Sequence, residues 1–243
     1  MKKNSLIKKM AIVAMFAAMS YVITVVAHYL HLTIVPSVPF LTYDPKDIII
    51  CIAGFVLGPF AALGVSVVVS FLEMITISQT GIYGCIMNII STSAFVIPAA
   101  LIYKSKKSFK GALLSLVVGF VSVVIVMTLW NIIITPIYMG IDRTLLINKF
   151  LLPIVIFNMV KTIVNISLVL LLYKPVITAL RAIRLIEKKE NSSNSKTTLT
   201  MLLIGGVLLV VSITVCFRKS GSPFILPINL NSTSSYFWLN SLT

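Results

Sequence analysis

Long uncharged runs of apolar residues dominate this chain of 243 residues. A helix needs roughly 20 residues to cross the hydrocarbon core of a bilayer. The runs between successive charged residues are each at least that long, and they lie at 10–43, 48–72, 74–103, 111–141 and 197–217. A further stretch, 150–173, is interrupted only by Lys161. We therefore predict an all-α, polytopic membrane protein.

The charged residues indicate how the chain is oriented. Only 11% of the residues are charged, against 58% hydrophobic, and the formal net charge is +14. Most of the basic residues fall in three clusters: before the first span, in the segment YKSKKSFK, and after Lys174. By the positive-inside rule, all three clusters and the N-terminus belong in the cytoplasm. Because topology accounts for the positive charge, we expect no nucleic-acid binding.

The Gly58-Pro59 pair determines the number of crossings. An even number of crossings must separate the N-terminus from YKSKKSFK, and a glycine followed by proline ends or turns a helix. We predict two helices joined there by a tight cytoplasmic turn, the first with Asp44 as N-cap and Pro45 at its first position. That helix has about 13 residues and spans about 20 Å, so neighbouring helices must shelter it. The six predicted crossings are about 10–30, 45–57, 60–78, 84–103, 112–137 and 150–174.

A seventh apolar segment, 199–217, follows the six crossings. We predict that it is an additional C-terminal transmembrane helix, and a segment lying on the membrane surface is the alternative. The expected organisation has four parts. They are a six-helix membrane domain at 1–186, a polar cytoplasmic linker at 187–198, the extra helix at 199–217 and a tail at 218–243.

The stretch FNMVKTIVN places polar side chains in the middle of the sixth span. Asn158, Lys161 and Asn165 have the spacing i, i+3, i+7, which puts them on one face of a helix. A lysine at that depth costs about 2.5–3.5 kcal/mol unless it faces a cavity or finds a partner. Glu73 is the one acidic residue clearly within a predicted span, so we expect few ion-pair partners. We favour ligand contact over a structural network between helices.

Further carboxamides lie at a similar depth in the preceding helices. Asn88 belongs to the outer half of the fourth predicted helix and Asn131 to that of the fifth. Together with the sixth-helix face they indicate one polar pocket that opens outward. Amides and a lysine in an apolar cavity suit a flat, mostly uncharged ligand with carbonyls and ring nitrogens.

The sequence carries no pattern typical of an enzyme. There is no phosphate-binding G-x-x-x-x-G-K-[ST] loop, no visible nucleophile and base constellation, and no third ligand near His28 and His31. We therefore expect neither catalysis, nor a metal site, nor a cofactor.

Small residues mark one face of the first helix. Ala14 and Ala18 are spaced i, i+4, and small residues at this spacing let helices approach closely in lipid. The face either packs within this chain or forms a surface for a partner.

Several stretches together resemble the substrate-binding S-components of energy-coupling factor (ECF) vitamin importers, particularly the riboflavin-binding members. The resemblance covers roughly residues 8–186, and its order and spacing make it fairly specific. The stretches are the alanine motif in the first helix, PFLTYDPKDIIICIAGFVLGPFAAL, TGIYGCIMNIISTSAFVIPAALIYK, LWNIIITPIYMG and FNMVKTIVN. Residues 197–243 lie outside the pattern, because the family normally has six helices.

The resemblance implies a vitamin-capturing subunit in the bacterial cell membrane. Such subunits bind the vitamin on the outer side and associate with a coupling protein, EcfT, and two cytoplasmic ATPases. The resemblance assigns Ala14 and Ala18 to docking with the coupling protein. It assigns Asn131, Asn158 and Lys161 to contacts with the isoalloxazine ring of riboflavin, which is a transported ligand here and not a cofactor.

The remaining assignments follow from location. Thr42, Tyr43 and Asn88 are expected near the ribityl chain, whereas Asn165 lies deeper and is expected to join helices. Two alternatives stay open: an S-component for another vitamin or heterocycle, and a membrane scaffold or sensor without transport.

Overall fold

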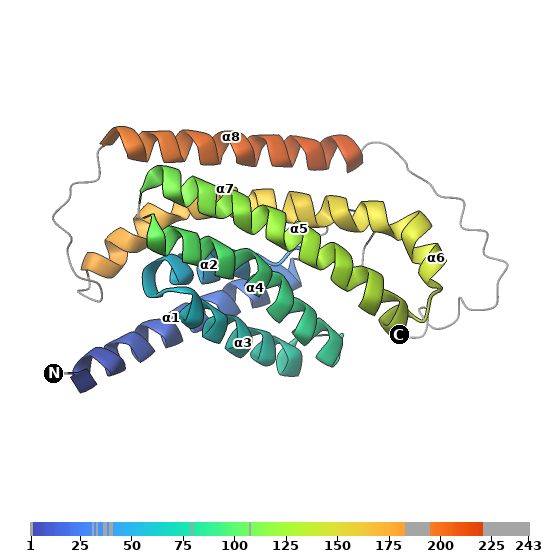
Figure 1. Ribbon diagram of the computed structural model, residues 1–243, viewed down its shortest axis with the longest axis horizontal. Coiled ribbons are helices and arrows are strands. Elements are labelled where there is room, and N and C mark those ends of the chain that lie inside the picture. The colour runs from blue at the N-terminus through green and yellow to red at the C-terminus, as the bar shows by residue number, and fades with distance from the viewer. Residues whose placement is uncertain are drawn as a thin grey trace.

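The computed structural model is a bundle of helices (Figure 1). It describes residues 2–30, 32, 34–35, 38, 41–78, 80–106, 108–182 and 195–220. The helices are α1 (Lys2–Tyr29), α2 (Lys46–Leu57), α3 (Pro59–Thr76), α4 (Gly81–Ser105), α5 (Phe109–Met139), α6 (Arg143–Leu145), a π-helical turn η1 (Leu146–Phe150), α7 (Leu151–Ala182) and α8 (Ser195–Ser220).

The lengths of the helices agree with a membrane-spanning domain. Within the described residues, five stretches are long and apolar enough to cross a bilayer: Leu6–Tyr29, Pro59–Thr76, Gly81–Ser105, Lys110–Met139 and Arg143–Ala179. Helix α2 has only 12 residues, and every residue from Lys46 to Gly54 is buried. The short helix is therefore sheltered by its neighbours, as predicted from its length.

Gly58 makes the predicted turn between α2 and α3. Its φ of +99° and ψ of 172° lie in a region that glycine alone occupies readily, and Pro59 opens α3 directly after it. The predicted start of α2 is wrong by one residue, since the cap position is Pro45. Asp44 still accepts a hydrogen bond from the backbone N–H of Lys46 at 3.1 Å. Pro45 has no backbone N–H, so Asp44 accepts the hydrogen bond from the N–H of the next residue, Lys46.

The additional helix α8 packs lengthwise against α7, on the side of the bundle away from α1 and α3 (Figure 1). Gly205 permits this approach, because a Cβ added there would lie 3.0 Å from the backbone oxygen of Ser167. The predicted seventh helix is thus present as a helix. Its crossing of the membrane stays a prediction, as do the four-part domain boundaries; residues 187–194 and 221–243 lie outside the described residues.

Gly119 fixes the close contact between α4 and α5. A Cβ at this position would lie 2.6 Å from the backbone oxygen of Phe95, which no side chain can accommodate without a shift of backbone. We expect Gly119→Val to lower the free energy of unfolding by about 1–3 kcal/mol through overpacking. The measurement is thermal unfolding in detergent. Gly64→Val is the matched control, because nothing lies within 4 Å of a Cβ there; equal loss of stability in both variants would contradict the prediction.

Candidate functional site

A pocket with a volume of about 300 Å³ opens at one end of the bundle. It is formed by the last turns of α1 and α3, the first turns of α4, the second half of α5, the first half of α7 and the loop before α2. Its volume lies at the lower end of the range for small-molecule sites. Five of the six residues predicted to bind substrate line it: Thr42, Asn88, Asn131, Asn158 and Lys161.

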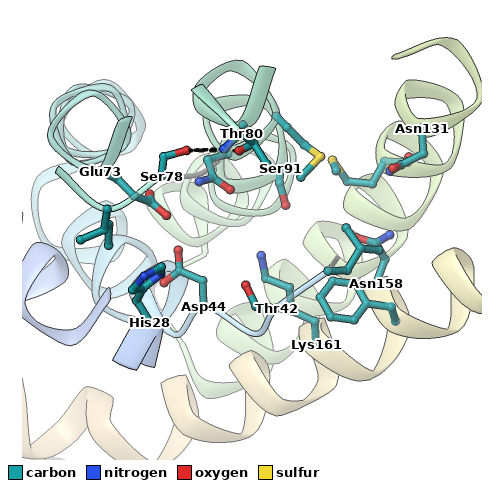
Figure 2. Close-up of a pocket in the computed structure, with 17 residues that line it drawn as sticks. His28, Thr42, Asp44, Glu73, Ser78, Thr80, Ser91, Asn131, Asn158 and Lys161 are labelled. Carbon is teal, nitrogen blue, oxygen red and sulfur yellow. Dashed lines mark hydrogen bonds between the residues drawn. The ribbon is translucent and has the colours of Figure 1, made fainter. Parts of the chain in front are cut away.

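Asn131 and Asn158 form what we call the amide end of the pocket (Figure 2). Only 1% of Asn131 and 3% of Asn158 is exposed. Each side-chain nitrogen donates to a carbonyl one turn back, Asn131 to Met127 at 2.7 Å and Asn158 to Ile154 at 2.9 Å. Because a carboxamide carries two N–H groups, each residue keeps a second donor for a ligand while its orientation is fixed.

Lys161 lies between the two ends of the pocket and is paired with an acidic residue. Its Nζ is 3.1 Å from Oδ2 of Asp47, in the first turn of α2. The Asp47 carboxylate also accepts hydrogen bonds from Thr92 at 2.6 Å and from Asn165 at 3.3 Å. Lys161 thus has an ion-pair partner that the sequence analysis did not count as lying within a span. Asp47 sits near a helix start in the sequence, but the burial of α2 carries it into the bundle.

Asn165 joins α7 to the loop before α2. Its oxygen accepts a hydrogen bond from the Tyr43 hydroxyl at 2.8 Å, and its nitrogen donates to Asp47. This agrees with the expected packing role of Asn165. Tyr43 does not line the pocket, in contrast to its neighbour Thr42. Burial, together with the charges of Asp47 and Asp44, raises the pKa of the Tyr43 hydroxyl, which keeps it a neutral donor.

Asp44 and Glu73 form the acidic end of the pocket, opposite the amide end (Figure 2). Both carboxylates bind the ammonium of Lys46, which is 2.6 Å from Glu73 and also contacts Asp44. Burial would raise the pKa of Asp44, but the charges of Lys46 and Lys161 outweigh it and hold that pKa below its usual value. Asp44 is therefore charged.

The acidic end and Asp47 are the features that the sequence analysis missed. The segment DPKD places three charges at the start of a helix that is otherwise apolar and too short to span alone. A helix that must be enclosed by its neighbours brings its end charges into the protein, and this was the available signal. It identifies the charges as buried, but it does not identify their partners.

The small residues of α1 face outward. Ala14 and Ala18 are exposed, whereas Phe16, Ala17 and Ser20 on the other face are buried against the bundle. Val22, one turn beyond Ala18, is also exposed. Among the described residues, no packing within this chain explains the alanine pair, since both side chains lie on the outer surface.

The pocket lies at the end of the bundle away from two groups of lysines, Lys8 with Lys9 and Lys104 with Lys110. Lys104 ends α4 and Lys110 begins α5, while the pocket-lining residues of those helices come from their other halves. Lys8 and Lys9 lie in the first half of α1, and His28 at its far end lines the pocket. These lysines and the pocket therefore lie at opposite ends of the bundle.

The chain matches the model of a known protein family. The model described as "ECF transporter, substrate-specific component" matches residues 8–173. The matched segment contains the whole pocket and the alanine pair, and it ends before α8.

Individual relatives agree with the family match. The chain is 28% identical over 168 residues to "Riboflavin transporter FmnP" of Bacillus subtilis, covering 65% of this chain and 86% of that protein. It is 28% identical over 182 residues to "Riboflavin transporter RibU" of Staphylococcus aureus, covering 72% and 94%. A solved structure of the S component of a bacterial ECF transporter superposes with a TM-score of 0.61 at 25% identity, covering 74% of this chain and 99% of that one.

Proposed function

Because this chain belongs to the family of substrate-specific components of ECF transporters, we propose that it captures riboflavin outside the cell for import. The observation that carries the proposal is the convergence of Asn131, Asn158 and Lys161, from two helices, on one pocket. Two relatives, each aligned over most of its own length, are riboflavin transporters.

The amide end suits the pyrimidine edge of the isoalloxazine ring. That edge presents two carbonyls with an N–H between them, and carboxamides can complement both kinds of group. Lys161 adds a charge-assisted hydrogen bond to a carbonyl or ring nitrogen. Apolar lining residues such as Met87, Met127 and Phe157 would cover the ring faces.

The basic clusters support a cytoplasmic N-terminus. Lys8, Lys9, Lys104 and Lys110 lie at the end of the bundle away from the pocket, and positively charged segments stay on the cytoplasmic side. In this orientation the pocket opens outside the cell, where a vitamin is captured.

The proposal is tested by identifying the bound ligand. The full chain, purified in detergent from cells grown with riboflavin, is expected to be yellow and to carry quenched flavin fluorescence. Mass spectrometry of the released ligand then identifies it. A colourless preparation that also binds no added riboflavin would contradict the proposal, and a panel of other vitamins would then identify a different ligand.

We propose that the exposed alanine face of α1 docks against an EcfT-type coupling protein, which works with two ATPases. Small side chains on a lipid-facing helix permit close contact with a partner helix, and both alanines are exposed.

Enlarging the alanine face is expected to separate binding from transport. Ala14→Leu with Ala18→Leu would lower riboflavin uptake by about tenfold or more, because the partner helix is held away. Riboflavin affinity of the purified subunit would stay unchanged, since neither residue lines the pocket. Val207→Leu on the exposed face of α8 is the control. Normal uptake by the double variant would contradict docking through this face.

A further inference from the structure

A chain of hydrogen bonds, which we call the Asp47 network, lies behind the wall of the pocket. Oδ1 of Asp47 accepts from the Thr92 hydroxyl of α4 at 2.6 Å, and Oδ2 accepts from the Asn165 amide of α7 at 3.3 Å. Asn165 in turn accepts from the Tyr43 hydroxyl at 2.8 Å. Asp47 is 2% exposed, and Thr92 and Asn165 are 1% exposed. None of these four is among the described residues that line the pocket, so the network can affect a ligand only through another side chain.

Lys161 is the side chain through which the network reaches the pocket. Its Nζ is 3.1 Å from Oδ2 of Asp47, and its side chain points into the pocket (Figure 2). The ammonium and the Asn165 amide therefore share Oδ2, whereas Thr92 holds Oδ1. An ammonium has three N–H groups and could donate to both oxygens of one carboxylate. The Thr92 hydroxyl thus keeps the ammonium of Lys161 on one oxygen.

The contact made by Thr92 differs from those of other threonines in the described helices. The hydroxyls of Thr76, Thr128 and Thr162 each donate to the carbonyl one turn back in their own helix. That carbonyl is a local partner available to a threonine inside a helix. Thr92 donates instead to a charged acceptor on another helix. Its hydroxyl therefore fixes the orientation of the Asp47 carboxylate.

We propose that Thr92 is a positioning residue for riboflavin, which orients Asp47 so that Lys161 presents its ammonium to the ring. This rests on the proposed function. Without the Thr92 hydroxyl, Oδ1 is free to accept from Lys161, and the ammonium moves onto both oxygens and away from the ligand. A binding side chain needs such support because a misaligned hydrogen bond is weak. The loss then appears in riboflavin affinity, although Thr92 does not line the pocket.

The test measures riboflavin affinity of the full chain in detergent, by quenching of flavin fluorescence. Thr92→Val removes the hydroxyl and keeps the branched shape, and it should weaken binding by about three- to tenfold. Thr92→Ala also lacks the hydroxyl and carries the same expectation, so a folding defect of the valine variant does not decide the result. Thr92→Ser keeps the hydroxyl and should restore nearly normal affinity. Thr128→Val is the matched control, because that hydroxyl donates within its own helix.

A double-variant cycle separates positioning of Lys161 from general support of the fold. In the Lys161→Ala chain the ammonium is absent, so the addition of Thr92→Val should cause no further loss of riboflavin affinity. Two changes that act independently would add their effects instead. An equal loss in both backgrounds would therefore overturn the proposal, since Thr92 would then act on the pocket without Lys161.

The remaining outcomes distinguish this inference from the proposed function. If the variants without the hydroxyl bind riboflavin as tightly as the unaltered chain, the positioning role of Thr92 is wrong and riboflavin capture stands. A loss of affinity in Thr92→Ser as large as that in Thr92→Val would also contradict the role, because the hydroxyl would not be the cause. Failure of the unaltered chain to bind riboflavin would instead overturn the proposed function.

Discussion

Lys161→Ala is expected to weaken riboflavin binding by about 10- to 150-fold. The variant removes a charge-assisted hydrogen bond, which contributes about 1.5–3 kcal/mol. Lys161 is 9% exposed and lines the pocket between its two ends, so its ammonium can reach a ligand while it stays paired with Asp47. The measurement is a titration with riboflavin, followed by flavin fluorescence.

A companion variant separates ligand contact from structural support. Lys161→Gln keeps a hydrogen-bond donor for Asp47 but removes the charge, so it should lose less stability than Lys161→Ala and still bind riboflavin more weakly. If both variants bind riboflavin as tightly as the original chain but unfold at lower temperature, Lys161 is a structural residue and the ring contact is wrong.

Asp47→Leu is expected to lower the free energy of unfolding by about 3–5 kcal/mol. Removal of one partner from a buried ion pair leaves the other charge uncompensated. Asp47 also accepts hydrogen bonds from Thr92 and Asn165, which would lose their acceptor. Three helices, α2, α4 and α7, meet at this one carboxylate. Thermal unfolding of the purified variant in detergent measures the effect.

A double variant identifies the cause of that loss. Adding Lys161→Met to Asp47→Leu removes the unpaired ammonium, so the double variant should be more stable than Asp47→Leu alone. If the double variant loses as much free energy of unfolding as Asp47→Leu and Lys161→Met lose together, the contribution of Asp47 does not come from the ion pair.

The sequence predicts the helices well because few kinds of backbone structure can span a bilayer. Apolar length and the Gly58-Pro59 pair are local signals, and each translates directly into a helix or a turn. The common face of Asn158 and Lys161 follows from helical spacing in the same way. These signals need no knowledge of which helices are neighbours.

Side-chain contacts between different helices could not be predicted from the sequence. The pairing of Lys161 with Asp47 depends on how α2 and α7 are placed beside each other, which neither helix specifies alone. Tyr43 shows the same limit, since it lies next to Thr42 in the chain but turns to Asn165 instead of the pocket. A position in a loop indicates the region of a site, and packing decides which side chain enters it.

The carboxylate of Asp47 has a consequence for how the chain is made. Asn165, one of its partners, is 118 positions later in the sequence. At about 5–20 residues per second, synthesis of that interval takes on the order of ten seconds. During this time the first helices have emerged, but α7 has not arrived to neutralise the acid. Insertion of the short α2 is therefore expected to be completed late, once its final neighbour enters the membrane.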